Sequence, residues 1–180
     1  MFGGFWQELN KKQRKNIIID DEEAVSLEYS QMGPRILYGL CGIRPISEDC
    51  YRVPGYERYR NGIKKVFNAM TFAEKPMSRY PKGVKQMFKE DIRFQEVSDA
   101  IQRYHSGITH KFYFGIGHYL QYLESQILIK VLLGLKDLGI HALPIHDAVM
   151  VGKAWVDMSR QLMEQVFLDM TNVESWVQVE

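Results

Sequence analysis

The residues Leu143–Val151 form an apolar run that is interrupted by a single His-Asp pair. Apolar and β-branched residues on both sides of His146 and Asp147 predict two short strands joined by a tight turn. Packing gives no reason for a carboxylate inside such a run, and a turn would project the Asp147 side chain from its tip. Turn chemistry alone also selects Asp at such positions. We therefore expect a β-hairpin whose tip carries either a functional carboxylate or an ordinary turn residue.

Length and composition predict one well-filled domain, residues 1–180. The chain is 46% hydrophobic, which is enough for a single core. Cys41 and Cys50 are its two cysteines, so no disulfide framework is indicated and a reducing compartment is favoured. No segment has the apolar core of a signal peptide or the roughly 18 apolar residues of a membrane helix. We expect a soluble, cytoplasmic protein that does not bind a membrane.

Basic residues gather in two places, although the net charge is only +1. The first cluster contains Lys11, Lys12, Arg14 and Lys15, and the second contains Arg52, Arg58, Arg60, Lys64 and Lys65, with tyrosines between them. A small net charge neither requires nor excludes a nucleic-acid partner, because binding depends on where the charges lie. Each cluster is therefore either a candidate nucleic-acid surface or a solvated face.

The pattern of apolar residues predicts helices and short strands in a mixed order. In the first part we expect strands at Asn16–Ile19 and Ala24–Tyr29 around a polar turn, a helix at Arg35–Leu40, a loop at 41–54 and a helix at Tyr56–Phe72. In the second part we expect one or two helices within 84–104 and a long helix that follows Gly115–Gly117, runs to about Asp137 and is ended by Gly139. The 143–151 hairpin, a helix at 157–170 and a strand at 173–179 should come after it.

This order predicts an α+β fold with an antiparallel sheet, packed helices and a helical insertion at about 55–112. If both hairpins belong to one sheet, Glu28 at a strand end and Asp147 at a turn can approach each other. Two carboxylates in a cleft suit Mg²⁺ or Mn²⁺, which are hard ions that prefer oxygen ligands.

Three segments, in order, resemble the palm and fingers of family-A DNA polymerases and of the related single-subunit phage-type RNA polymerases. Leu27–Arg35 is similar to the first palm motif, Asp-Tyr-Ser-Gln-x-Glu-x-Arg, and Ile145–Ala148 is similar to the last palm motif. Between them, Arg60, Lys64, Asn68 and Phe72 resemble the nucleotide-binding helix of the fingers. The resemblance spans roughly 17–151 and implies a palm-like sheet, a short fingers-like insertion and template-dependent nucleotidyl transfer.

The resemblance also implies a metal site. Glu28 and Asp147 would hold Mg²⁺ or Mn²⁺, and His146 would contact the primer terminus or orient the Asp147 backbone. The family has Asp where this chain has Glu28, which is one methylene longer. Asp20 and Asp21 are fallback ligands, and Glu28 is otherwise a surface carboxylate at a strand end.

Nucleotide contacts are implied for the stripe Arg60, Lys64, Asn68 and Phe72, which recur every four residues and so share one helix face. Arg60 and Lys64 would neutralise phosphate charge, while Asn68 and Phe72 would lie near the sugar and base. An ordinary amphipathic helix with basic solvent positions has the same pattern.

Gly33 stands where the family's DNA polymerases have Glu and its RNA-synthesising relatives have Gly. The resemblance therefore implies that discrimination between sugars is relaxed or depends on Tyr29, Asn68 or Phe72. Alternatively, Gly33 serves only the start of the helix at Gly33-Pro34.

The resemblance further implies nucleic-acid contacts in two helices. Arg35 belongs to the first palm motif, and the helix before the last motif carries polar side chains that would reach the minor groove of a primer-template, unless they form only a solvated face. These polar residues are Gln121, Glu124, Ser125 and Gln126. The implied partners are primer-template nucleic acid, nucleoside triphosphates, and other polymerase domains or replication proteins.

Two further hypotheses remain beside a catalytic polymerase. A degenerate palm would bind nucleic acid or a partner polymerase without catalysis, as the replacement of Asp by Glu28 and the lack of thumb and exonuclease segments suggest. In the other hypothesis, His146 and Asp147 belong to a His-Asp phosphohydrolase. Its further ligands would be His105, His110 or His118 and Asp157.

Overall fold

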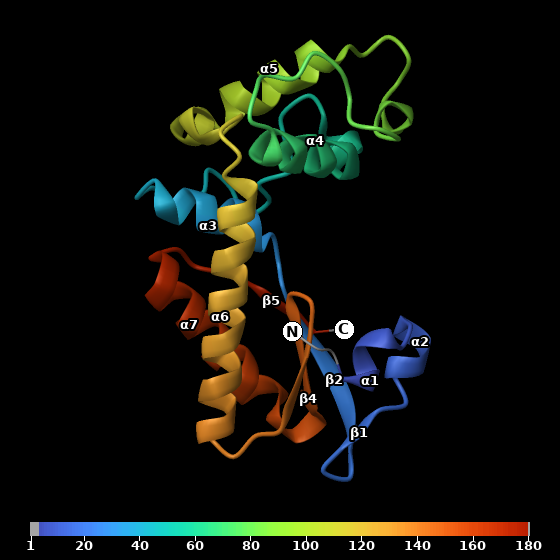
Figure 1. Ribbon diagram of the computed structural model, residues 1–180, viewed down its shortest axis with the longest axis vertical. Coiled ribbons are helices and arrows are strands. Elements are labelled where there is room, and N and C mark those ends of the chain that lie inside the picture. The colour runs from blue at the N-terminus through green and yellow to red at the C-terminus, as the bar shows by residue number, and fades with distance from the viewer. Residues whose placement is uncertain (1–3, 180) are drawn as a thin grey trace. The chain divides into compact units, whose positions relative to one another are not determined.

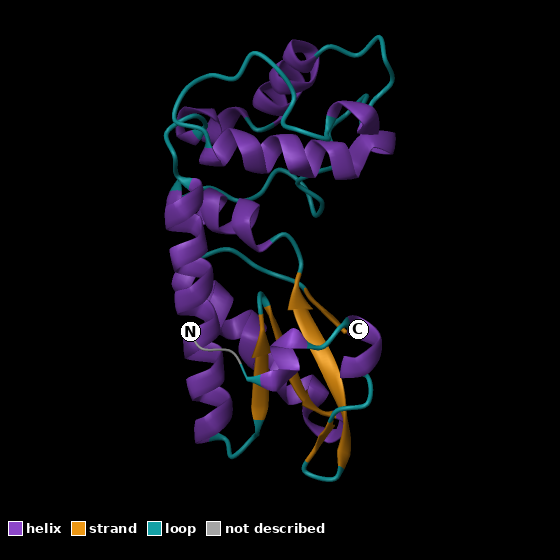
Figure 2. Ribbon diagram, turned by 45° about the vertical axis from the view of Figure 1, so that its right-hand side comes forward, coloured by secondary structure: helices purple, strands orange, loops and turns teal. Residues whose placement is uncertain are grey.

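The computed structural model describes residues 4–179 and contains a five-stranded antiparallel sheet with helices packed on it (Figures 1 and 2). The predicted α+β class is confirmed. The strands are β1 (Ile18–Ile19), β2 (Glu22–Tyr29), β3 (Ala142–Ile145), β4 (Ala148–Gly152) and β5 (Val177–Val179). The sheet order is β1-β2-β4-β3, and β5 also pairs with β2. Strand β2 is therefore central and joins the two hairpins that the sequence predicted.

The helices of the described residues are α1 (Phe5–Glu8), α2 (Lys11–Arg14), α3 (Met32–Leu40), α4 (Arg60–Phe72), α5 (Phe94–Tyr104), α6 (Gly117–Asp137) and α7 (Val156–Thr171). Short 3₁₀ turns occupy Glu57–Tyr59, Lys85–Met87, Ser106–Lys111 and Lys153–Trp155. None of the described helices combines the length and apolar character that crossing a membrane requires.

Contacts divide the chain into two compact units. The first contains the residues up to Arg35 together with those from Leu123 onward, and the second is Ile36–Tyr122. The whole sheet belongs to the first unit. The helical insertion predicted at about 55–112 lies within the second unit, and its assignment as a fingers-like part of one domain, 1–180, stays a prediction.

Two-residue turns close both hairpins. Asp20 and Asp21 have left-handed φ angles of 53° and 64°, and His146 has a φ of 53°. Asx residues tolerate this region better than most, which favours such turns. Because the first turn needs only Asp20 and Asp21, β2 starts at Glu22, two residues before the predicted Ala24.

Strand β2 alternates between two environments. Leu27 and Tyr29 are buried, whereas Ala24, Ser26 and Glu28, on the opposite face, are half-buried. On the Leu27 face, helix α7 packs against the sheet, with the rings of Tyr29 and Phe167 5.4 Å apart. On the Glu28 face, Ile19, Ile145 and Met150 form a small core.

Helices α1 and α2 were not predicted, because four-residue helices leave no periodic pattern. The side chain of Trp6 packs on the Glu28 face, and its Nε1 donates to the carbonyl of Pro144 at 3.0 Å. Asn10 and Gln13 form a capping box around α2. These contacts hold the first basic cluster against the sheet.

Three other predicted elements are shorter or differently placed than expected. Strand β5 begins at Val177 instead of 173, and α4 begins at Arg60 after a 3₁₀ turn. Within 84–104 only α5 is α-helical. The ammonium group of Lys85 donates to the carbonyls of Lys89, Glu90 and Ile92, which stabilises a loop where helix was predicted.

Candidate active site

The register of the sheet places one predicted metal ligand on β2 and the other on the turn directly before the neighbouring strand β4. Glu28 on β2 pairs directly with Ala148 on β4. Ala148 also pairs with Ile145 and so closes the turn that holds His146 and Asp147. Asp147 is therefore the residue next to the partner of Glu28. Glu28 is half-buried and Asp147 is exposed, as its position at a hairpin tip predicts.

The donor set suits a hard divalent ion. Glu28 and Asp147 supply carboxylate oxygens, which Mg²⁺ and Mn²⁺ prefer, and one or two protein carboxylates commonly hold Mg²⁺ with substrate phosphates and water. Over residues 4–179, no group of three or more His, Cys, Asp or Glu side chains is gathered tightly enough to bind a metal by itself. Glu28 and Asp147 could supply two ligands to such an ion, with phosphate and water completing its coordination.

Asp20 and Asp21 lie at the other end of β2 from Glu28. The strand has eight residues, which at about 3.4 Å each separates its ends by more than 20 Å. The Nδ1 atom of His141 also lies 2.7 Å from an Asp20 carboxylate oxygen. These residues therefore cannot replace Glu28 as partners of Asp147.

A third carboxylate, Glu124 of α6, lies close to the same region. Its Oε1 is 3.3 Å from the position that a Cβ on Gly33 would take. Burial, and secondarily the charge of Asp147, raises the pKa of Glu124 to about 7. The sequence predicted Glu124 only as a minor-groove contact. Glu124 lies near Gly33 and Asp147 because of the way α6 packs, and no local sequence pattern predicts this packing.

Tyr29, predicted to contact the nucleotide, belongs to the core. Its side chain is 2% exposed, on the face of β2 opposite Glu28, and its hydroxyl donates to the carbonyl of Met163 at 2.6 Å. Burial, and secondarily the charge of Glu164, raises the pKa of the phenol. The alternation of β2 placed Tyr29 with Leu27 and is the signal that could have indicated this.

Arg35, predicted to contact nucleic acid, is also buried, with 1% of its surface exposed. Its Nη1 donates to the carbonyl of Glu174 at 3.0 Å, and its guanidinium lies 3.8 Å from the centre of the Trp176 ring. Arg35 therefore attaches α3 to the segment before β5. A nucleic-acid contact stays a prediction and would require the guanidinium to leave this place.

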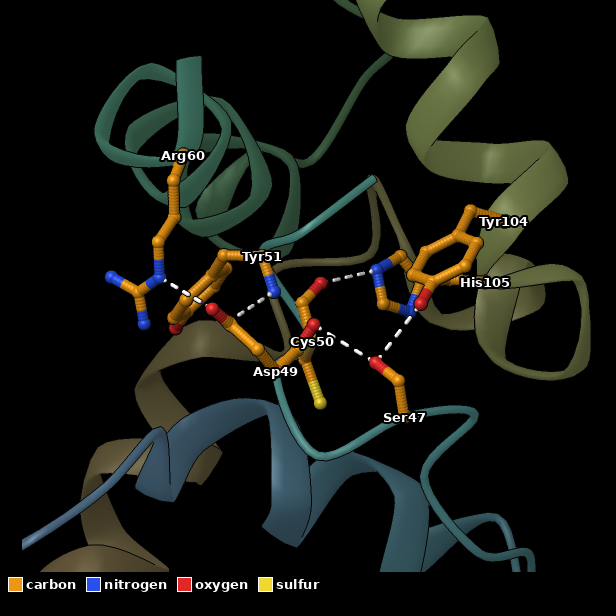
Figure 3. Close-up of polar contacts among 7 residues, drawn as sticks. All are labelled: Ser47, Asp49, Cys50, Tyr51, Arg60, Tyr104 and His105. Carbon is orange, nitrogen blue, oxygen red and sulfur yellow. Dashed lines mark hydrogen bonds and ion pairs between the residues drawn. The ribbon is translucent and has the colours of Figure 1, made fainter. Parts of the chain in front are cut away.

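The predicted phosphate contacts lie on α4, in the second unit. The Nε of Arg60 donates to Asp49 Oδ2 at 2.6 Å, and Asp49 Oδ1 accepts from the Tyr51 backbone N–H (Figure 3). Arg60 and Lys64 both lie near the face of the Tyr51 ring, at 5.6 Å and 5.9 Å. The second basic cluster is thus partly oriented by an acidic and an aromatic neighbour.

The rest of the α4 stripe differs in exposure. Asn68 is half-buried, whereas Phe72 is 38% exposed. The Phe72 ring packs edge-on against His118 and covers Gly117, where an added Cβ would stand 2.6 Å from the ring. Gly117 therefore permits the close approach of Phe72 to the first turn of α6.

His105 stabilises the second unit from inside. It is fully buried between the Tyr38 hydroxyl, 2.7 Å from Nδ1, and the Cys50 carbonyl, 2.8 Å from Nε2. The carbonyl accepts only, so Nε2 carries the proton and Nδ1 accepts from Tyr38. Burial lowers the pKa of His105 to about 4, although the Cys50 hydrogen bond opposes this. Figure 3 shows the His105 ring facing the Cys50 carbonyl and the Tyr104–Ser47 contact beside it.

The remaining predicted contacts lie on α6. Gln121 is exposed and belongs to the second unit, whereas Ser125 and Gln126 are half-buried and belong to the first.

The histidines of the phosphohydrolase hypothesis have other partners. His105 is buried as described, His118 packs on Phe72, and His110 Nε2 lies 3.8 Å from Cys41 Sγ. His146 and Asp147 lie on a hairpin turn and not on the helix that this hypothesis expects. The geometry therefore gives this hypothesis no support.

Comparison with known proteins gives a similarity of fold. No family model and no curated protein sequence matches this chain. The chain is similar to the POL domain of Pol1 from M. smegmatis, solved in complex with DNA primer-template and dNTP, with a TM-score of 0.55 and 13% sequence identity. The match covers 94% of this chain and 42% of that chain, so this chain spans less than half of the neighbour's length. The fold of this chain resembles that of a DNA polymerase domain.

Proposed function

We propose that this chain is the catalytic palm of a template-dependent nucleotidyltransferase that extends the 3′ end of a nucleic acid. The observation that carries the proposal is the pairing of Glu28 with Ala148, which brings Glu28 beside the Asp147 turn within a polymerase-like fold. The neighbour's complex with primer-template and dNTP supports the same class of ligands. If this chain is part of a longer protein, the same activity is proposed for that protein.

In the proposed reaction, the 3′ hydroxyl oxygen of the primer attacks the α-phosphorus of a nucleoside triphosphate. A new phosphodiester bond forms, the bond to the β-phosphate oxygen breaks, and pyrophosphate leaves with the hydroxyl proton released to solvent. Bound Mg²⁺ or Mn²⁺ supplies charge neutralisation at the reacting oxygens. Glu28 on β2 and Asp147 on the turn before β4 would hold this ion.

The other residues have binding roles in the proposal. The turn formed by His146 and Asp147 keeps Asp147 at the tip of the hairpin. The imidazole of His146 is exposed next to it in the chain. From the likeness of α4 to a nucleotide-binding helix, Lys64, which is exposed, would offer the triphosphate a point charge, and Arg60 would offer a guanidinium that Asp49 orients. Asn68 and Phe72 would contact the sugar and base.

The test is extension of a labelled primer-template with Mg²⁺ or Mn²⁺. We expect Asp147→Ala and Glu28→Ala to lower the extension rate at least about a thousandfold, because each removes half of the proposed ligand set. Glu23→Ala is the matched control, since Glu23 is an exposed carboxylate on the opposite face of the same strand. Unchanged extension by the Asp147 variant would refute the assignment.

Glu28→Asp separates catalysis from the alternative of a degenerate binding palm. If the longer Glu28 has displaced the ion, Asp at this position should increase extension. If neither the wild type nor Glu28→Asp extends a primer with Mg²⁺ or Mn²⁺, but both bind primer-template, the degenerate binding palm is the correct alternative.

A further inference from the structure

We infer that the first basic cluster forms a binding site for a backbone phosphate of the nucleic-acid strand. This inference rests on the proposed function, because it assigns the strand that the active site would extend. The site is a small cavity of about 50 Å³ between α2 and the sheet. Its lining consists of Lys11, Arg14, Lys15, Ala24, Ser26 and Met150.

The cavity opens on the same face of the sheet as Glu28. Side chains two residues apart on a strand share a face, so Ser26 and Glu28 point the same way, about 7 Å apart along β2. The register agrees, because Ser26 pairs with Met150 and Glu28 pairs with Ala148 two residues earlier on β4. A strand that approaches Glu28 along this face from the side of Ser26 would pass the basic cluster.

The chemistry of the lining selects an anion with several acceptor oxygens. Arg14, Lys11 and Lys15 provide positive charge, and Ser26 adds a neutral hydroxyl donor to the lining. Arginine, lysine and serine are common phosphate-contacting side chains in protein–DNA interfaces, where such contacts set the register of the strand.

The cluster is held in place by the rest of the first unit. Arg14 Nη1 donates to the carbonyl of Leu9 at 2.9 Å, and the capping box fixes α2. Both Trp6 Nε1 and Gln7 Nε2 donate to the Pro144 carbonyl of β3, at 3.0 Å and 3.1 Å. The cations are thus presented on a fixed frame, which lowers the entropy lost on binding.

The test measures binding of a labelled primer-template by fluorescence anisotropy, with chelator and without nucleotide. Lys15→Gln and Lys12→Gln each remove one positive charge, at positions three residues apart. Lys15 lines the cavity and Lys12 does not, so Lys12→Gln is the matched control. We expect Lys15→Gln to weaken binding about fivefold and to reduce the slope of log K against log[salt] by about 0.7 to 0.9. Lys12→Gln should change both much less.

Arg14→Gln combined with Lys15→Gln should weaken binding further, and circular dichroism checks that the double variant is folded. Equal effects of Lys12→Gln and Lys15→Gln would show a diffuse charge effect and overturn the site. Pyrophosphate and dATP can be added as competitors of the labelled primer-template. If Lys15→Gln weakened their competition but left binding of the strand unchanged, the cavity would bind free phosphates and the assignment to the strand would be wrong.

The two proposals fail separately. If the protein extends primers but Lys15→Gln leaves the salt dependence of primer-template binding unchanged, the proposed function stands and the phosphate site is wrong. If Lys15→Gln weakens strand binding but the wild-type protein extends no primer, the phosphate site stands and the proposed catalytic function is wrong.

Discussion

The carboxylate of Glu124 lies 3.3 Å from the point where a side chain on Gly33 would begin. Gly33 does not have a left-handed φ angle, so its backbone does not require glycine. The reason for a small residue is instead space, because α6 brings Glu124 against the first turn of α3. Gly33 and Glu124 therefore form a pair in which one residue makes room for the other.

A double-mutant cycle at Gly33 and Glu124 tests this pairing. Gly33→Ala should change the free energy of unfolding by less than about 1 kcal/mol, because a gain in helix propensity opposes a small displacement of Glu124. Gly33→Glu should cost about 1 to 3 kcal/mol through crowding and like charge. In the Glu124→Ala background this cost should mostly disappear, as urea unfolding would measure. Additive effects of the two changes would contradict the contact.

Glu124 should also make stability depend on pH. Its folded-state pKa is raised from 4.5 to about 7, so the folded protein holds a proton that the unfolded chain releases. Stability is then greatest below about pH 4.5 for this group and falls as the pH rises to about 7. The partly exposed position limits the effect to about 1 to 2 kcal/mol.

The variant Glu124→Gln should lose this pH dependence and be more stable than the wild type at pH 8. Asp147→Asn should lower the pKa of Glu124 only partly, because burial is the larger cause of its shift. Unfolding curves between pH 4 and 8 measure both effects. A wild type and a Glu124→Gln variant with parallel pH profiles would show that Glu124 is not perturbed.

The elements that the sequence predicted well are those set by local signals. The tip at His146 and Asp147 followed from an apolar run with a polar interruption, and Gly139, with a φ of 74°, ends α6 as expected. The loop after Lys85 was missed because three carbonyls along the chain converge on one ammonium group, a contact that no periodicity encodes.

The site was predictable in part for the same reason. Glu28 and Asp147 were identified from short motifs, and their approach required only that two hairpins join one sheet. The burial of Tyr29 and Arg35 does not follow from the motif, because it depends on contacts with α7 and with the segment before β5. Motifs indicate candidate residues, whereas packing decides which of their side chains are exposed.

Tyr29→Phe should separate a core role from a nucleotide contact. The change removes the 2.6 Å hydrogen bond to Met163 and should lower the free energy of unfolding by about 1 to 2 kcal/mol. We expect the KM for nucleotide to stay unchanged. A raised KM with unchanged stability would instead support the nucleotide contact that the motif implies.

His105 should give stability a pH dependence of the opposite sign to that of Glu124. Its folded-state pKa is lowered from 6.5 to about 4, so the unfolded chain binds a proton that the folded protein does not. Stability is full above about pH 6.5 and falls by up to about 3 kcal/mol as the pH drops to about 4. NMR titration of the His105 ring that gave an ordinary pKa would contradict the prediction.

Arg35→Lys tests whether this residue positions the fold or binds nucleic acid. Lysine keeps the charge but loses the planar group that stacks on Trp176 at 3.8 Å and donates to the Glu174 carbonyl. We expect a loss of about 1 to 3 kcal/mol in the free energy of unfolding. The salt dependence of primer-template binding should stay unchanged, because a buried guanidinium contacts no phosphate. Arg44→Lys, at an exposed position, is the control and should affect neither measurement. A variant with normal stability and a smaller salt slope would instead make Arg35 a direct nucleic-acid ligand.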